Sequence, residues 1–221
     1  MKSYGQFCSI ARALDLLGER WTLLIVREVL CGGRTFGDIR RGIPRISRTM
    51  LAARLHELVD AGVLERRGAE GYELTESGYD LIGVVMALGT WGQKWLSRHV
   101  EPDELDVDAL VWDMRRRVDI AQLPRRPTVV RIELTDLRRA ATRYLLLRPT
   151  EVSLCATNPG FPDSLVVTTD RHTLIGWWRG DVTYAQAKQR GLRVSGPPAL
   201  VRAFPTWFQR YLLAEVAPQS A

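Results

Sequence analysis

The chain has 221 residues, 46% of them hydrophobic, a length and composition that allow two small hydrophobic cores. Its net charge of +6 favours an anionic partner but is shared equally between residues 1–98 and 99–221, so it does not locate a binding site. No apolar run reaches the roughly 18 residues of a membrane span, and the N-terminus lacks the basic-then-apolar order of a signal peptide. We therefore expect a cytoplasmic protein without a membrane partner.

Residues that commonly carry chemistry are sparse. Cys8, Cys31 and Cys155 are an odd number at irregular spacing, which argues against disulfides and against zinc. The histidines stand in no metal or nucleophile spacing, and the sequence contains no glycine-rich phosphate loop, paired-carboxylate motif or nucleophile elbow. We therefore expect no enzyme, no cofactor and no metal site.

Hydrophobic periodicity predicts two scaffolding helices, at residues 9–17 and 21–30. Two further predicted helices follow, and together they indicate a helix-turn-helix. Its first helix, residues 36–41, must end before Pro44, because proline lacks a backbone N–H and restricts the residue before it. Ser47 is a suitable N-cap for the second helix, which we expect to run to about residue 61.

The second helix of this pair has the two faces of a recognition helix. Leu51, Leu55 and Leu58 recur on one side and predict a core contact. Thr49 and Ala53 lie on the opposite side, where short side chains allow close approach to a major groove. The alternative is an ordinary amphipathic surface helix.

Arginine dominates the same stretch. Between residues 34 and 54 the only acidic residue is Asp38, and guanidinium groups bind phosphate bidentately, so the stretch favours a DNA backbone over plain solvated surface. Two short strands are then predicted at residues 63–67 and 72–75 and would form a wing. Glu65 and Glu70 lower the net positive charge of this wing. The predicted DNA contacts are Arg34, Arg40, Arg41, Arg45, Ser47, Arg48, Thr49, Ala53 and Arg54, with Arg66 and Arg67 near the wing tip.

Six short blocks lie in this region: LGERWTLLIVRE at 17–28, RTFGDI at 34–39, Ile46-Ser47, RLHEL at 54–58, YELTESG at 72–78 and Trp91-Gly92. In this order and spacing they resemble the HxlR family of bacterial winged-helix regulators, relatives of the MarR-type repressors. The resemblance implies a dimeric, sequence-specific transcription regulator. The chain departs from the family in having Cys8-Ser9 where Cys-Pro is common, and in having a shorter wing without proline.

The same family includes members that oxidise a cysteine near the position of Cys8. A signalling thiol must be accessible and partly ionised. The nearest candidate cations are Lys2 and Arg12, and no helix N-terminus is certain to lie over Cys8, so we expect a quiet thiol. A redox switch at Cys8 is the alternative trigger.

Thr75 can cap a long helix over residues 76–98, whose apolar face is broader than one small domain requires. Such a helix spans roughly 35 Å. Packed against a symmetry mate, it would place two recognition helices one DNA turn apart. The alternative is a lid within the protomer. The predicted dimer contacts are Leu81, Val85, Leu88, Trp91 and Trp95.

An acidic segment around Pro102 follows, so we predict domains at residues 1–99 and 104–221 and an α+β fold class. In the second domain we expect a helix at 107–118 with a solvated Arg115–Arg117 run. The remaining predictions are strands at 128–134, 143–147, 152–156, 165–169, 173–178 and 192–195, a helix from Asp181 to Arg190 and a final helix at 197–213.

The order of Ser164–Asp170, Gly180–Tyr184 and Gly191–Gly196, followed by an amphipathic helix, resembles the sterol-carrier-protein fold. The resemblance implies an α+β domain whose sheet and last helix enclose an apolar tunnel for a lipid-like or other hydrophobic molecule. The alternative is that the aromatic residues simply fill the core. The candidate ligand contacts are Trp112, Trp177, Trp178, Phe204, Trp207 and Phe208.

Together these patterns predict a homodimeric, sequence-specific DNA-binding transcription regulator that a hydrophobic small molecule modulates through the C-terminal domain. The expected partners are double-stranded DNA, a second copy of the chain and that molecule. Besides the Cys8 switch, the rival is a lipid-carrier-like protein whose N-terminal half is a protein-interaction module. The residues do not encode the operator, the ligand or the sign of regulation.

Overall fold

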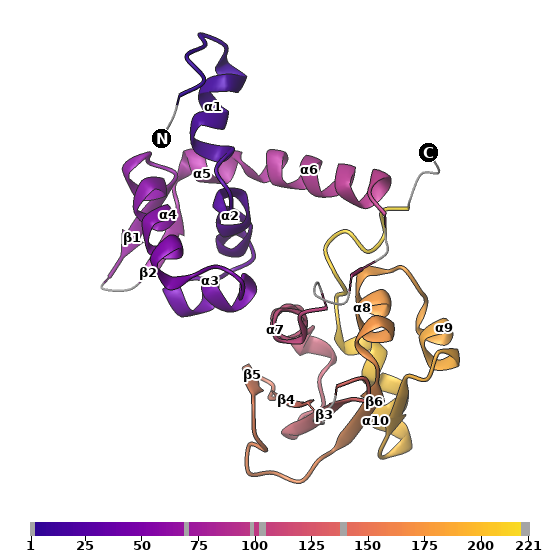
Figure 1. Cartoon of the computed structure of the whole chain (residues 1–221). Helices are drawn as coiled ribbons and strands as arrows, with labels where there is room; N and C mark the ends of the chain where they lie inside the picture. Colours follow the sequence, from indigo (N-terminus) through magenta and orange to yellow (C-terminus); the bar gives the residue numbers. More distant parts are fainter. Residues whose placement is uncertain (1–2, 69–70, 98–99, 102–104, 138–140, 218–221) are drawn as a thin grey trace. The chain divides into compact units, whose positions relative to one another are not determined.

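The structure is a computed structural model that describes residues 3–68, 71–97, 100–101, 105–137 and 141–217 (Figure 1). Contacts divide the chain into two compact units, Met1–Gly89 and Thr90–Ala221. Four expectations fall on residues outside the described ranges: the helix end at Arg98, the domain boundary around Pro102, the wing residue Glu70 and the candidate cation Lys2. Among the described residues, no helix is long and apolar enough to cross a membrane.

The first unit is a helix-turn-helix followed by a two-stranded wing, close to the prediction. Leu51, Leu55 and Leu58 are fully buried and share a core with Ile25 and Ile39, so the leucine side of the second helix of the pair faces inward. In chain order the elements are α1 (Ser9–Leu17), α2 (Thr22–Leu30), α3 (Phe36–Gly42), α4 (Arg48–Asp60), β1 (Leu64–Arg67), β2 (Gly71–Leu74), α5 (Glu76–Asp80) and α6 (Ile82–Trp95), which continues into the second unit.

The predicted long helix at residues 76–98 is instead two helices. Thr75 does cap α5, because its Oγ1 accepts a hydrogen bond from Gly78 N at 3.2 Å. At Leu81 the backbone N–H bonds back three residues, to Gly78 O, and this tighter turn interrupts the α-helix before α6 begins. α6 ends at Trp95, short of the predicted end.

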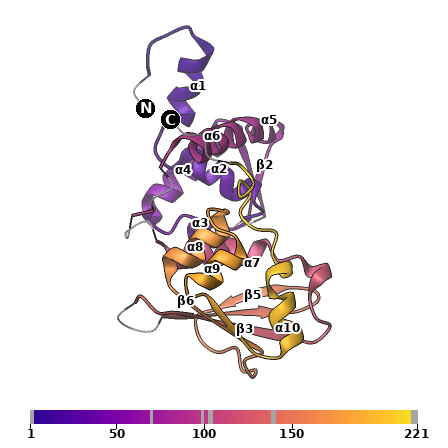
Figure 2. The same cartoon turned by 90° about the vertical axis from the view of Figure 1, so that its right-hand side faces the viewer.

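The second unit is an α+β domain on a five-stranded sheet of order β5-β4-β3-β6-β7. β3 and β6 are parallel, and the other neighbours are antiparallel. α7 and α8 lie over one face of the sheet (Figure 2), and their apolar side chains share a core with Val130, Ile132 and Leu165. The elements are α7 (Val107–Arg116), η1 (Ile120–Gln122), β3 (Thr128–Leu134), β4 (Ala141–Leu147), β5 (Val152–Cys155), β6 (Leu165–Thr169), α8 (Arg171–Arg179), α9 (Tyr184–Gln189), β7 (Arg193–Ser195), α10 (Pro198–Ala203) and η2 (Phe204–Trp207).

Residues 173–178 were predicted as a strand but form most of helix α8, so that prediction is wrong. Asp170 caps the helix by accepting hydrogen bonds from the N–H (2.8 Å) and the hydroxyl (2.7 Å) of Thr173. Gly180 ends it in the left-handed region, at φ 82°. Almost every residue of the run is buried, so it lacks the polar positions that mark a surface helix.

The helix predicted from Asp181 to Arg190 begins later. Thr183 Oγ1 accepts a hydrogen bond from Gln186 N (3.2 Å), and Gln186 Oε1 accepts one from Thr183 N (2.8 Å). This reciprocal capping box sets the start of α9 at Tyr184.

The final helix, predicted for residues 197–213, ends at Ala203. Pro205 has no N–H to continue the α-helical hydrogen bonds, so the chain tightens into the short helix η2. Beyond η2 the backbone is extended, and Phe208 pairs with Val118 in an isolated β-bridge. The residues just after η2 are therefore held against the residues just after α7.

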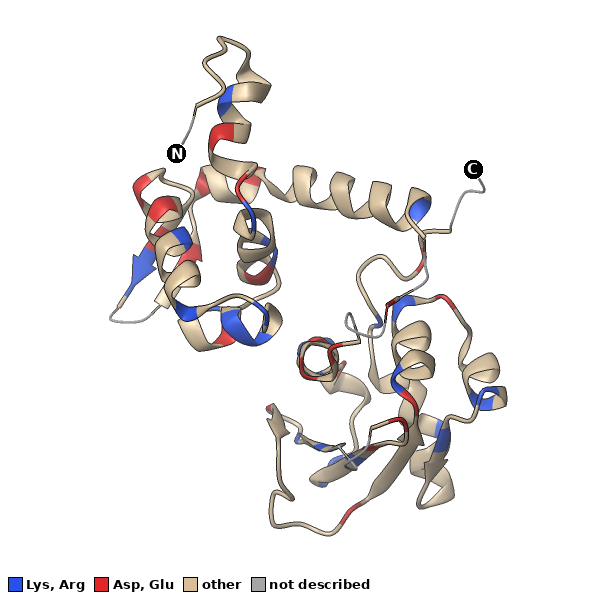
Figure 3. Ribbon diagram, in the orientation of Figure 1, with Lys and Arg blue, Asp and Glu red and all other residues tan. Residues whose placement is uncertain are grey.

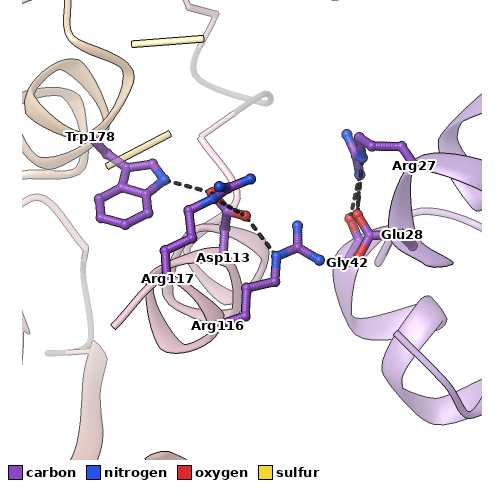
Figure 4. Close-up of polar contacts among 7 residues, drawn as sticks. All are labelled: Arg27, Glu28, Gly42, Asp113, Arg116, Arg117 and Trp178. Atoms are coloured by element: carbon purple, nitrogen blue, oxygen red, sulfur yellow. Dashed lines mark hydrogen bonds and ion pairs between the residues drawn. The ribbon is translucent and has the colours of Figure 1, made fainter. Parts of the chain in front are cut away.

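A partly buried polar cluster corrects the expectation of a solvated Arg115–Arg117 run (Figure 4). Asp113 Oδ1 accepts hydrogen bonds from Arg116 Nε (2.8 Å) and Arg117 Nε (3.2 Å), and Asp113 Oδ2 accepts one from Trp178 Nε1 (2.8 Å). The two arginine side chains are only 14% and 16% exposed. They lie three and four residues after the aspartate, so all three meet on one side of α7. Arg116 and Arg117 therefore hold Asp113, which joins α7 to α8 through Trp178.

Candidate nucleic-acid interface

Two side-chain caps fix the helix-turn-helix. Thr35 Oγ1 accepts a hydrogen bond from Asp38 N (3.1 Å), and Asp38 Oδ2 accepts one from Thr35 N (3.2 Å). This capping box starts α3 and was not predicted, although Thr-Phe-Gly-Asp carries its signature. Ser47 Oγ accepts a hydrogen bond from Met50 N (3.1 Å) and starts α4, as expected. The caps fix which residues lead α4.

The outer face of α4 is free of bulky core side chains. Because the leucine face is buried, Arg48, Thr49, Ala53 and His56 are exposed. Arg48 and Thr49 are the first two residues of the helix, and the N-terminal residues of a recognition helix are those that contact base edges. A guanidinium in that position can bond the O6 and N7 acceptors of guanine.

Behind the turn lies a buried carboxylate that sequence reasoning missed. Glu28 of α2 is fully buried, and its Oε1 accepts hydrogen bonds from Arg27 Nε (3.0 Å) and Nη2 (2.5 Å). Arg27 Nη2 also donates to the carbonyl of Gly42 at the end of α3 (3.2 Å; Figure 4). A Cβ at residue 42 would overlap the Glu28 carboxylate, so glycine is required there. These contacts tie α2 to the turn before α4.

Most of the predicted arginines gather at the helix-turn-helix. Arg34, Arg45 and Arg48 are exposed, Arg40 is half-buried, and the exposed Arg41 contacts Asp38 at 3.4 Å. Figure 3 shows this basic character along α3 and at the start of α4. The arrangement offers several guanidinium groups to phosphates on either side of a groove.

Arg54 is placed differently. Its side chain is only 12% exposed, and its two terminal nitrogens pair with Glu19 Oε2 and Glu57 Oε2, each at 2.5 Å. Arg54 therefore anchors α4 to the turn between α1 and α2, and its charge is already matched by two carboxylates.

The wing arginines are also engaged within the protein. Arg67 of β1 pairs with Glu65 (2.8 Å) and with Glu73 of β2 (3.0 Å). Arg66 lies over the ring of Tyr72, 5.5 Å from its centroid. Positive charge is thus weaker on the wing than at the helix-turn-helix.

α6 carries an exposed apolar stripe, formed by Val84, Leu88, Trp91 and Trp95 at positions i, i+4, i+7 and i+11. Each of these side chains is about half exposed, and the spacing places them on one side of the helix. The other two predicted dimer residues are partly buried against the core of the first unit instead. These two partly buried residues are Leu81 and Val85. Further exposed apolar side chains lie on the N-terminal arm and α1, at Tyr4, Phe7, Ile10 and Leu14.

Cys8 is the N-cap residue of α1 and is partly exposed. The thiol makes no capping hydrogen bond, but the backbone N–H groups of Ala11 and Ile10 favour its thiolate form. They lower the pKa of Cys8, against a smaller opposing effect of burial. From sequence no helix N-terminus was certain to lie over Cys8, and the structure places the start of α1 there. That the thiol is quiet stays a prediction.

The six candidate ligand residues of the second unit are all buried. Five form one cluster of rings, with contacting centroids 5.3 to 6.4 Å apart, and Arg115 lies over the ring of the sixth, with its Cζ 4.7 Å from the ring centroid. Within the described part of the chain, Trp207 Nε1 is buried without a hydrogen-bond partner. The cluster consists of Trp177, Trp178, Phe204, Trp207 and Phe208, and the sixth residue is Trp112.

Comparisons with known proteins match the first part of the chain. The family described as HxlR-like helix-turn-helix matches residues 16–100. The uncharacterized HTH-type transcriptional regulator Mb3122 of Mycobacterium bovis is 42% identical over 100 residues, which cover 42% of this chain and 63% of that protein. The chain thus matches less than two thirds of that relative's length.

Two Bacillus subtilis proteins match over a similar region. The uncharacterized HTH-type transcriptional regulator YvaP is 32% identical over 101 residues, which cover 43% of this chain and 90% of YvaP. The solved structure of the reduced form of the transcriptional regulator YodB is 32% identical, with a TM-score of 0.38, over 43% of this chain and 100% of that one.

Proposed function

Because the chain belongs to the HxlR family of helix-turn-helix regulators, we propose that it is a homodimer that binds a specific DNA operator and regulates transcription. The observation that carries the proposal is the outer face of α4, which begins at a capped N-terminus and exposes Arg48 and Thr49 first. In the complex, α4 enters the major groove and these two side chains meet base edges. Arg34, Arg41 and Arg45 contact phosphates and hold the register.

A second copy of the chain is the partner that suits the α6 stripe. Two indole rings and two aliphatic side chains on one side of a helix form an apolar patch of the kind that homodimers bury. A twofold axis through such a contact would bring two α4 helices to half-sites about 34 Å apart, one turn of DNA.

The proposal is tested by selecting genomic DNA fragments that the purified chain retains at physiological salt. We expect enrichment of a few fragments that share an inverted repeat, with half-sites about 10 base pairs apart. Retained fragments without a common sequence, or none retained at all, would contradict operator binding and favour a protein-interaction role for the first unit.

A second candidate is a thiol-redox trigger at Cys8, and the helix N-terminus that lowers its pKa supports it. A lowered pKa leaves more of the reactive thiolate at neutral pH. We expect alkylation of Cys8 by iodoacetamide, followed by mass spectrometry, to have a pH midpoint below the ordinary cysteine value of about 8.5. Diamide should then release DNA from the wild type and not from Cys8→Ser. A midpoint at the ordinary value, or equal release from both proteins, would exclude this trigger.

We also propose that a hydrophobic molecule modulates DNA binding through the second unit. The sterol-carrier resemblance supports this, and so does the buried Trp207 Nε1–H, because an unsatisfied donor costs about 1–3 kcal/mol. A ligand with one hydrogen-bond acceptor would satisfy it. Such a ligand changes operator affinity only as far as it binds one arrangement of the dimer more tightly than another. The coupling free energy is typically about 1–3 kcal/mol.

A long-chain fatty acid titrated into the full chain is expected to quench tryptophan emission and to raise the melting temperature. Trp207→Phe keeps the ring contact with Phe204 but removes the donor, so it should weaken binding about two- to tenfold. Trp112→Phe, outside the ring cluster, is the matched control. Unchanged emission and melting temperature with fatty acids and flat aromatic compounds would reduce the second unit to a structural module.

A further inference from the structure

The second unit has a stretch whose basic residues lack acidic neighbours in sequence. Several arginines elsewhere in this unit pair with carboxylates, as Arg143 does with Asp108 (2.6 Å) and Arg148 with Glu151 (2.5 Å). From residue 182 to residue 214, by contrast, the chain contains no Asp or Glu. Its basic residues are Lys188, Arg190, Arg193, Arg202 and Arg210.

Three of these residues, Lys188, Arg190 and Arg193, lie where α9 turns into β7, and we call them the α9–β7 corner. Gly191 makes the turn at φ 106°, and Leu192 N donates to the carbonyl of residue 187 at 3.0 Å, which fixes it. All three basic side chains are exposed. Figure 3 shows Lys and Arg, in blue, at the end of α9 and the start of β7. Among the described residues, no carboxylate pairs with any of the three.

We propose that the α9–β7 corner is a second contact with the DNA backbone, an inference that rests on the proposed operator binding of the first unit. The two units are covalently linked, so a corner that reaches DNA held by the first unit meets it at an effective concentration of up to about millimolar. Weak phosphate contacts are occupied under those conditions. They add affinity without sequence information, since phosphates are the same at every base step.

A membrane surface and a protected sheet edge both account for the corner less well than DNA does. A membrane-inserting surface would place apolar side chains between the charges, but between Lys188 and Arg202, a range described throughout, no large hydrophobic side chain is exposed. Protection of a sheet edge by charge explains Arg193, which lies on the edge strand β7. It does not explain Lys188 or Arg190, which precede the strand.

The test is the salt dependence of binding by the full chain to a mixed-sequence duplex of about 40 base pairs. Each phosphate contact contributes about 0.9 to the slope of log K against log salt. The proposed homodimer carries the corner twice, so the double variant Arg190→Gln, Arg193→Gln removes up to four contacts. It is therefore expected to reduce the slope by up to about 3.6 and to weaken operator and mixed duplex by the same factor. The control, Arg143→Gln with Arg148→Gln, removes the same charge from arginines that already have carboxylate partners, and it should leave the slope unchanged.

The outcomes separate the two proposals. A slope unchanged by Arg190→Gln, Arg193→Gln but reduced by Arg41→Ala would overturn the corner and leave operator binding intact. An equal reduction in the control would also overturn it, since net charge alone would then explain the effect. Failure of the wild type to bind any duplex would instead overturn the proposed function. If Arg190→Gln, Arg193→Gln abolished binding to phosphatidylserine vesicles but left the salt slope of DNA binding unchanged, the corner would be a membrane contact and the inference would be contradicted.

Discussion

Leu88→Asp is expected to make the chain monomeric at micromolar concentration and to lower its operator affinity at least about a hundredfold. Leu88 is 54% exposed on α6, so a carboxylate stays hydrated in a single protomer and costs folding little. In a dimer that buries the stripe, the same carboxylate lacks a cation, which costs several kcal/mol. Loss of the second copy then removes one half-site contact. Light scattering gives the mass, and titration of the operator gives the affinity.

Ile120→Asp is the matched control for that experiment, because Ile120 is 45% exposed and belongs to η1 rather than α6. It should leave both mass and affinity unchanged. Trp91→Asp, on the same stripe as Leu88, should repeat the effect. A dimer that survives both α6 substitutions would favour a lid within the protomer and contradict the twofold arrangement.

The first unit could be predicted because its elements carry local signals. Pro44 ends one helix and Ser47 begins the next, and both act through their own backbone neighbours, so no distant contact is needed to place them. Glu28 and Gly42 escaped prediction for the opposite reason. A glutamate on a helix is ordinarily solvated, and only the packing of α2 against the end of α3 buries it.

Arg54 shows the same limit within the candidate site. From its position in a run of arginines it was predicted to contact phosphate. In the structure its guanidinium donates a hydrogen bond to Glu19, 35 residues earlier in the chain. The partner of a charged side chain depends on tertiary structure. The sequence therefore predicted which surface is basic more reliably than which arginines are available on it.

The second unit was harder because its signals are not periodic. α8 is buried on nearly all sides, so its hydrophobic residues resemble those of a buried strand, and only the caps at Asp170 and Gly180 distinguish the two. The aromatic residues could be predicted to cluster in this unit. Whether they line a cavity or fill a core depends on side-chain packing, which the sequence does not specify.

The central claim is that α4 reads DNA sequence. The most direct measurement compares Arg48→Ala, Thr49→Ala and Arg41→Ala on the selected operator and on a mixed-sequence duplex. A base-edge contact contributes about 1–3 kcal/mol of discrimination, so Arg48→Ala and Thr49→Ala should each lose roughly 5- to 150-fold in operator affinity and much less on mixed sequence. Arg41→Ala should weaken both duplexes by the same factor, because a phosphate contact carries no sequence information. It should lower the salt slope of the homodimer by about 1.8, which is one contact from each protomer. Equal losses on both duplexes for Arg48→Ala and Thr49→Ala would contradict the assignment of α4 as the recognition helix.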